Sequence, residues 1–302
     1  MHTFTIDPTT MPMHRAIFYS IIALFAVIFT IVGSMLFGRL PSPKDTTPQV
    51  AAVGVISPFI YSFNSTSTLY EAGSMQESTS PYWFVNSGAM MIIKNGIGST
   101  AMGNLELGNK WQLLYAAMNP IDSDQGLHPQ NTFRLVSRNS WDNVRLSAAF
   151  KIVRDNLSTS SNRNASNGLL FMSRYRDSQT LYYAGVRVDG TAVIKKKYHG
   201  TYYTMAQKAI FPGTYDRALL PNLLPHGEWF NLKNETITNA DGTVAVRLFM
   251  QRAGEPSWTK ILETTDDGKK FGNTPPITGS AYVGIRTDFM DVLFDNYRAE
   301  IL

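Results

Sequence analysis

From residue 53 onward, apolar and polar side chains alternate along the chain with a period of two. Within residues 144–152 the apolar positions are Val144, Leu146, Ala148, Phe150 and Ile152. Residues 243–251 repeat the alternation, with Val244, Val246, Leu248 and Met250 on one side. This period is that of a β-strand with one buried face, and it predicts an all-β body.

The same pattern predicts a series of short strands separated by turns. Asp-Gly pairs at 189–190, 241–242 and 267–268 mark tight turns. Many short strands at this spacing predict a sandwich or a jelly roll of two antiparallel sheets. Besides 144–152 and 243–251, strands are expected at 56–63, 82–93, 111–116, 132–137, 168–175, 181–188, 191–198, 202–208, 228–238, 257–263, 281–287 and 291–301.

Residues 16–37 form an apolar run without a single charged side chain. As a helix at about 1.5 Å per residue, the run would span the roughly 30 Å hydrocarbon core of a bilayer. A cleaved secretory signal has a shorter apolar region, and a buried core helix is rarely apolar on every face. The run therefore predicts an uncleaved transmembrane anchor, with the cleaved signal and the core helix as alternatives.

The anchor divides the chain into four parts. We expect a polar tail at 1–14, the transmembrane anchor at 15–38, a Pro-rich stalk at 39–52 and one β-sandwich domain at 53–302. Arg15 precedes the run and Arg39 and Lys44 follow it, so the charges do not decide its orientation. The polar and aromatic composition of the body suits contact with glycans, which favours a single-pass membrane protein with an extracytoplasmic domain.

Composition removes several classes of function. The chain has no cysteine, which excludes disulfides, thiol catalysis and cysteine-based zinc sites. The formal net charge is +4, and the one basic cluster, Lys195–Lys197, alternates across a predicted strand. Nucleic-acid binding is therefore not expected.

Three segments of the body resemble a known family. They are Gly227–Lys233 (GEWFNLK), Gly284–Asp288 (GIRTD) and Phe294–Tyr297 (FDNY). Together with the order of the strands, they resemble concanavalin A-like lectin and glucanase domains, which include laminin G-like modules. The resemblance covers about residues 80–302 and implies two curved antiparallel sheets, with ligands on the concave face or at one edge. A fold of this kind does not by itself determine an activity.

Enzymatic signatures of that family are incomplete in this chain. A retaining glucanase needs two carboxylates about 5 Å apart, and the Glu-x-Asp-x-x-Glu strand of laminarinase-type enzymes is absent. Residues 182–186 resemble the aromatic–Ala–Gly strand of alginate lyases, but the Gln-x-His strand of those enzymes is missing. His128 and His199 are the available bases for such a lyase. Binding without turnover is thus the expectation, and a polysaccharide lyase is the alternative.

A binding face is predicted around the Asp189-Gly190 turn. A two-residue turn would place Val188 opposite Thr191 and Val186 opposite Val193, with the valines in the core. Aromatic rings cover the apolar faces of sugars, and Arg and Lys donate to hydroxyls and carboxylates. The pattern predicts a carbohydrate site that favours acidic sugars, although tyrosines also occur on ordinary solvated strands. The predicted site residues are Tyr183, Arg187, Lys196, Tyr198 and His199, with Ile194 on the same face.

A calcium ion is a further expectation. Asp122 and Asp124 lie two residues apart in a predicted loop, an arrangement common in calcium sites. The family resemblance implies that Asp295 contributes a third carboxylate. The competing interpretation is that each aspartate caps its own turn.

Two other functions also stay open: glycan processing, and a structural or adhesive role in the cell envelope.

Overall fold

The computed structural model describes residue 54 and residues 57–302. The predicted polar tail, anchor and stalk all lie outside the described residues. Within the described part, no helix is long and apolar enough to cross a bilayer. The body belongs to a single compact unit, Pro48–Leu302.

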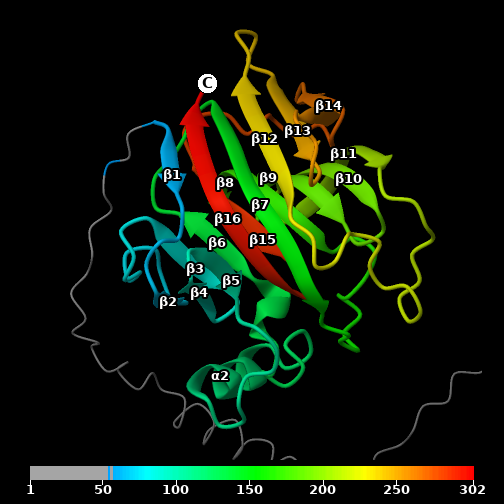
Figure 1. Ribbon diagram of the computed structural model, residues 1–302. Helices are drawn as coiled ribbons and strands as arrows, with labels where there is room; N and C mark the ends of the chain where they lie inside the picture. Colours follow the sequence, from blue (N-terminus) through cyan, green and yellow to red (C-terminus); the bar gives the residue numbers. More distant parts are fainter. Residues whose placement is uncertain (1–53, 55–56) are drawn as a thin grey trace, which may run out of the picture. The chain divides into compact units, whose positions relative to one another are not determined.

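Two antiparallel sheets make up the body (Figure 1). Sheet A faces the viewer in Figure 1, and sheet B lies behind it. Sheet A has the strand order β14 (Thr259–Asp266), β13 (Val244–Gln251), β12 (Phe230–Thr238), β7 (Val144–Asp155), β16 (Met290–Ile301), β5 (Ile97–Thr100), β4 (Met90–Lys94) and β2 (Ser67–Tyr70). Sheet B has the order β11 (Thr201–Ala209), β10 (Thr191–Tyr198), β9 (Thr180–Arg187), β8 (Gly168–Asp177), β15 (Tyr282–Thr287), β6 (Arg134–Ser137) and β3 (Trp83–Ser87).

Strand β1 (Phe59–Tyr61) is attached to sheet A beside β16. It pairs with residues 297–299 of β16, and β5 pairs with residues 293–294 of the same strand. Because β7 occupies the other edge of β16, β1 and the β5–β4–β2 group lie on one side of it. The body therefore begins at the same side of sheet A that carries β2.

The core fills the space between the sheets. Leu146 and Phe150 of β7 and Leu232 of β12 meet Phe171 of β8 and Val186 of β9, and all are fully buried. The predicted alternation holds in β7, where Arg145 and Ser147 point away from this core. The predicted all-β sandwich of two antiparallel sheets is confirmed.

Several predicted elements are wrong in detail. The expected strand 111–116 is helix α2 (Lys110–Met118), which begins after Asn109, whose side chain accepts a hydrogen bond from the backbone N–H of Trp111. The expected strand 82–93 is two strands, β3 and β4, in different sheets, with positive φ at Gly88 and Ala89 between them. Strands β2 and β5 and the short 3₁₀ helix η2 (Pro129–Thr132) were not predicted.

The turn at Asp189-Gly190 is longer by one residue than predicted. The backbone N–H of Gly190 donates to the carbonyl of Arg187 at 2.9 Å, and Gly190 has a φ of +78°. Val186 therefore pairs with Ala192, where the prediction had Val193. A shift of one residue turns every side chain of the second strand to the other face of the sheet.

Candidate functional site

The outer face of sheet B, which points away from sheet A, gathers aromatic and cationic side chains from five strands. Lys195 of β10 is paired with Tyr183 of β9, and Arg286 of β15 is paired with Arg134 of β6. Paired residues of neighbouring strands point to the same side of a sheet. Tyr202 of β11 joins this face by stacking on Tyr183.

An apolar layer lies under these polar groups. Leu170 and Met172 of β8, Val193 of β10 and Val136 of β6 form a cluster with Tyr183 that is separate from the inter-sheet core. All four apolar residues are buried, although they lie on the outer side of the sheet. The long side chains of this face therefore pack on an apolar floor, which gives them a defined position.

Tyr183, Tyr202 and Arg286 form the centre of the face. The two rings stack with their centroids 6.2 Å apart and an interplanar angle of 23°. Arg286 lies 5.4 Å from the centroid of the Tyr183 ring and donates to its hydroxyl at 3.0 Å. The carboxylate of Asp288 contacts Nε and Nη2 of Arg286, both at 2.8 Å. Tyr202 is 48% exposed, so part of the stack is accessible to a ligand.

The face carries an excess of positive charge. The Nζ atoms of Lys197 and Lys195 lie 4.7 and 6.0 Å from the centroid of the Tyr202 ring. Burial acts to raise the pKa of Tyr202, but the charges of Arg286 and Lys197 outweigh it and the pKa is lowered. Burial, helped by the charge of Arg187, also lowers the pKa of Lys195. A site that favours the anionic form of a tyrosine favours an anionic ligand as well.

A groove of about 590 Å³ adjoins this centre. Arg134 lines the groove and donates to the side-chain oxygen of Asn86 at 2.7 Å. Phe84, Tyr175 and Tyr282 supply aromatic walls. Arg134 is paired with Arg286 on the neighbouring strand, so the groove lies on the same face as the tyrosine stack. We refer to Tyr183, Tyr202, Arg286, Lys195, Lys197 and the Arg134 groove together as the sheet B site.

The predicted site residues are divided between two faces of sheet B. Tyr183 belongs to the sheet B site, and Arg187 lies on the same face at the end of β9, bound to Asp189 at 2.6 Å. Lys196 is fully buried on the opposite face, in an ion pair with Asp266 at 2.7 Å. The prediction that these residues share one face is wrong, because it rested on the two-residue turn.

Tyr198 and His199 are also separate from the sheet B site. Tyr198 follows Lys196 on the inner side of β10, where it packs beside the Ile194 cluster. His199 is exposed in the turn after β10, with a φ of +47°. The residues that the sequence did not indicate are Lys195, Lys197, Tyr202, Arg286 and Arg134.

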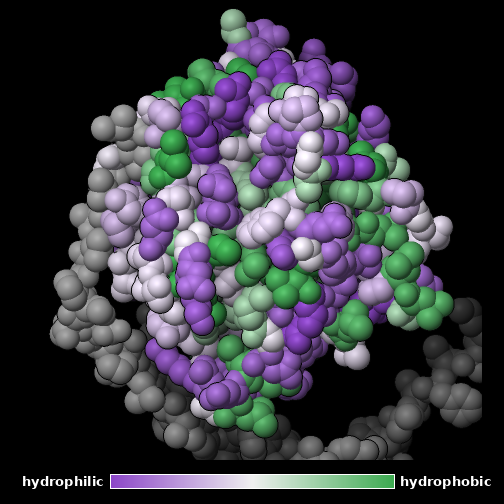
Figure 2. All heavy atoms as spheres, in the orientation of Figure 1, coloured by the Kyte–Doolittle hydropathy of each residue, from purple (hydrophilic) through white to green (hydrophobic). Residues whose placement is uncertain are grey.

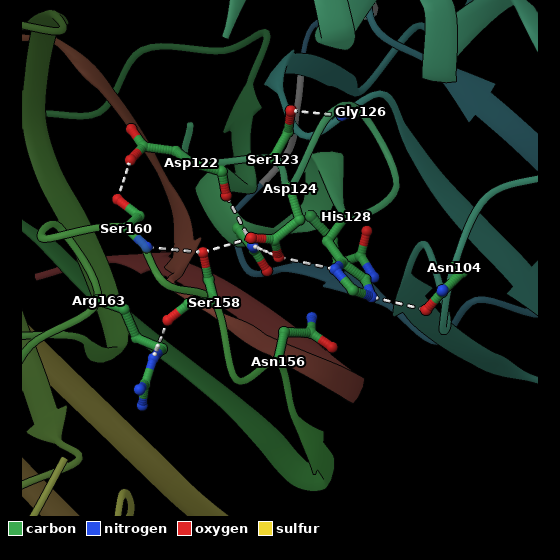
Figure 3. Close-up of polar contacts among 12 residues, drawn as sticks. Asn104, Asp122, Ser123, Asp124, Gly126, His128, Asn156, Ser158, Ser160 and Arg163 are labelled. Atoms are coloured by element: carbon green, nitrogen blue, oxygen red, sulfur yellow. Dashed lines mark hydrogen bonds and ion pairs between the residues drawn. The ribbon is translucent and has the colours of Figure 1, made fainter. Parts of the chain in front are cut away.

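The predicted calcium ligands are engaged in hydrogen bonds of their own (Figure 3). Asp124 pairs with Nδ1 of His128 at 2.9 Å and accepts from the hydroxyl of Ser158 at 2.5 Å. Asp122 accepts from the hydroxyl of Ser160 at 2.5 Å. Asp295 lies on β16 and accepts from the backbone N–H of Asn296.

These carboxylates do not form one metal site. Among the described residues, no group of three or more acidic or histidine side chains converges in a way that could hold a metal ion. The carboxylates of Asp122, Asp124 and Asp295 thus do not fit a shared calcium ion, and calcium binding stays a prediction from sequence.

On the outer face of sheet A, by contrast, the arginines are paired with carboxylates. Glu235 of β12 lies between Arg145 of β7 at 2.7 Å and Arg247 of β13 at 3.6 Å. Glu300 and Glu263 continue the row on either side. Opposite charges on neighbouring strands stabilise the sheet, so these arginines are already engaged. The sheet B site is therefore the better candidate.

The sequence matches no protein-family profile and no curated protein sequence. Among solved structures, the chain is similar to the carbohydrate-binding module CBM66 from Bacillus subtilis, with 11% identity and a TM-score of 0.43 over 72% of this chain and 94% of that one. A mutant of the GH43 protein BlXynB from Bacillus licheniformis gives 11% identity and a TM-score of 0.46, over 83% of this chain but only 40% of that one.

A prokaryotic beta-1,3-1,4-glucanase (lichenase) from a mouse hindgut metagenome is also similar. It has 7% identity and a TM-score of 0.41, over 82% of this chain and 99% of that one. Similarities at this level describe the arrangement of strands and carry no argument about activity.

Proposed function

We propose that this protein is a membrane-anchored, extracytoplasmic carbohydrate-binding protein that holds an acidic glycan on the sheet B site. One observation carries the proposal: the stack of Tyr183 and Tyr202 is bordered by Arg286, Lys195 and Lys197 on one sheet face. The exposed part of Tyr202 suits the apolar face of a sugar ring, and the cations suit its carboxylate or sulfate groups.

The membrane part of the proposal rests on the sequence alone. The uncharged run within residues 15–38 is long enough to span a bilayer, and the prolines of residues 39–52 would hold the body away from the surface. Flotation of the full chain with lipid vesicles tests this part independently of any glycan.

Glycan binding is tested with the full chain in detergent on an array of neutral and acidic glycans. We expect signal on glycans with uronate or sulfate groups, which weakens as salt is raised. Tyr202→Ala and Arg286→Gln should each lower the affinity, whereas Tyr198→Ala, on the other face of the sheet, should not. An absence of signal on every glycan would favour a structural or adhesive role.

A polysaccharide lyase is the second candidate, and the lowered pKa of Tyr202 favours it. A tyrosinate can take the C5 proton beside a uronate carboxylate, while Arg286 neutralises that carboxylate. The electron pair of the broken C–H bond forms a C4–C5 double bond, the C4–O bond to the neighbouring sugar breaks, and the leaving oxygen takes a proton from the tyrosine or from water. The product is an unsaturated uronate that absorbs ultraviolet light. Tyr202→Phe should keep binding but abolish this product. If the unaltered protein forms no such product from polyuronates, the lyase is excluded.

A further inference from the structure

Helix α2 exposes its apolar side chains and buries polar ones. The hydroxyl of Tyr115 donates to Glu71 at 2.6 Å and accepts from the backbone N–H of Gly88 at 2.6 Å. Gln112 is buried as well and donates to the carbonyl of Gln125 at 2.8 Å. The helix is therefore held to the body by hydrogen bonds on its inner side, and its outer side is left to the apolar residues.

These exposed residues belong to one stretch of the chain. Leu114 and Met118 lie one turn apart on α2, Leu113 lies beside Leu114 on the solvent side of the helix, and Leu107 and Ile121 flank the helix in sequence. Their exposed fractions run from 37% to 82%. Figure 2 shows hydrophobic side chains at the lower end of the molecule, where Figure 1 places α2. We call these five residues the α2 patch.

The α2 patch has an aromatic and cationic border. Trp111 stacks on Tyr70 of β2, with centroids 6.1 Å apart and an interplanar angle of 11°. The Nζ atom of Lys110 lies 5.6 Å from the centroid of the Trp111 ring. Tryptophan, tyrosine and lysine beside exposed leucines are the residues enriched where a protein meets the headgroup layer of a membrane.

The chain between the apolar run and β1 is long enough for the α2 patch to meet a bilayer that holds the run. Strand β1, the first of the body, lies on the same side of β16 as β5, β4 and β2, and Trp111 of α2 stacks on β2. Residues 38–58 separate the apolar run from β1, and a chain of that length reaches at most about 75 Å. Strand β1 begins beside Ala299, near the end of β16, whereas α2 lies at the other end of the body (Figure 1). This reach exceeds the roughly 40 Å length of a twelve-residue strand such as β16, so a bilayer that holds the run can also meet α2.

We propose that the α2 patch lies in the interfacial layer of the bilayer in which the chain is anchored. This inference rests on the membrane anchoring of the proposed function and is independent of glycan binding. The turn after α2, which carries Ile121, is fixed by the hydrogen bonds of Asp124 with His128 and Ser158, so the patch is presented on a rigid support (Figure 3).

The experiment uses single cysteines, which the chain allows because it has none of its own. Met118→Cys and Leu113→Cys carry an environment-sensitive fluorophore, and the full chain is reconstituted in phosphatidylcholine vesicles with or without lipids that bear a doxyl quencher near the headgroup. Thr259→Cys, exposed on the opposite edge strand β14, is the matched control. We expect a blue shift and loss of emission for both α2 labels and neither for the control.

Each other result overturns the inference in a recognisable way. Labels on α2 that emit as in water, in a chain that floats with the vesicles, would show that the body is anchored without docking. A blue shift without quenching would show that protein covers the patch, either a second copy or another segment of this chain. A chain that does not float with vesicles would overturn the docking and the anchoring together, while glycan binding would be judged by the array.

Discussion

Replacing Lys196 should destabilise the fold severely without removing a ligand contact. The ammonium group donates to all three acceptors around it: Asp266 at 2.7 Å, the carbonyl of Thr274 at 2.9 Å and the carbonyl of Pro275 at 2.8 Å. The side chains of Lys196 and Asp266 have no exposed surface. At an effective dielectric constant of about 20, charges at this separation attract by about 6 kcal/mol, which offsets the loss of hydration of both ions.

Lys196→Met removes that attraction and leaves the carboxylate of Asp266 buried. The hydroxyl of Tyr182 at 2.5 Å and the backbone N–H of Gly268 at 3.1 Å would be its remaining partners. We expect the free energy of unfolding to fall by about 3–5 kcal/mol. With a denaturant slope of about 3 kcal/mol/M, the urea midpoint should fall by about 1 to 1.7 M. Tryptophan fluorescence of the full chain in detergent follows the transition.

Two further variants separate the ion pair from general damage. Lys195→Met alters the adjacent residue on the other face of β10 and should change stability by less than about 1 kcal/mol. Lys196→Met combined with Asp266→Leu removes both charges and should recover most of the loss, because a buried pair replaced by apolar groups is often neutral. If Lys196→Met is as stable as Lys195→Met, or if the double variant is weaker than the single one, the reasoning is refuted.

Three more outcomes follow from the described contacts. Arg174→Met should lower the free energy of unfolding by about 3 kcal/mol, measured by urea titration, because its fully buried guanidinium binds a carboxylate, a carbonyl, an amide and a hydroxyl. The hydrogen bond to Asp155 raises the pKa of His226, so this pair stabilises the fold at low pH and loses its effect as pH rises through the raised value; His226→Gln should remove that part of the stability change between about pH 6 and pH 8. Gly126→Ala should lower the melting temperature, because the backbone has a φ of +82° and the new methyl group would lie 1.9 Å from the carbonyl oxygen of Gln112.

The sheets were predictable because most strands bury one face. Wherever a strand has one buried face, as in β7 and β13, the alternation of side chains gives its extent within a few residues. The prediction fails in residues 111–116 for a physical reason. In α2 the apolar side chains point to solvent and Gln112 and Tyr115 point inward, so the sequence lacks the stripe that normally identifies a helix.

The site was predictable only in part, and the turn after β9 explains why. Tyr183 lies on β9, before the turn, so its assignment to an aromatic, cationic face did not depend on the loop length. The face assigned to each residue of β10 did depend on the loop length. Because the loop has one more residue than predicted, Lys196 lies in the core, and Lys195 and Lys197 lie on the outer face. The face is cationic with either loop length, because three consecutive lysines place a positive charge on both sides of the strand.

The sequence pattern could not indicate Arg286, because its contact with Tyr183 depends on the order of the strands in sheet B. Strand β15 is adjacent to β8, and β8 to β9, so residues about a hundred positions apart in the chain meet on one face. Local patterning cannot indicate which distant strands become neighbours, since the alternation is satisfied by any order that buries the same faces. Charge is the property that distinguishes the outcomes: the order in the structure places Arg286 and Arg134 beside the lysines of β10, where their mutual repulsion has no structural benefit. Like charges gathered on an open face cost stability, and an anionic ligand is the partner that would offset that cost.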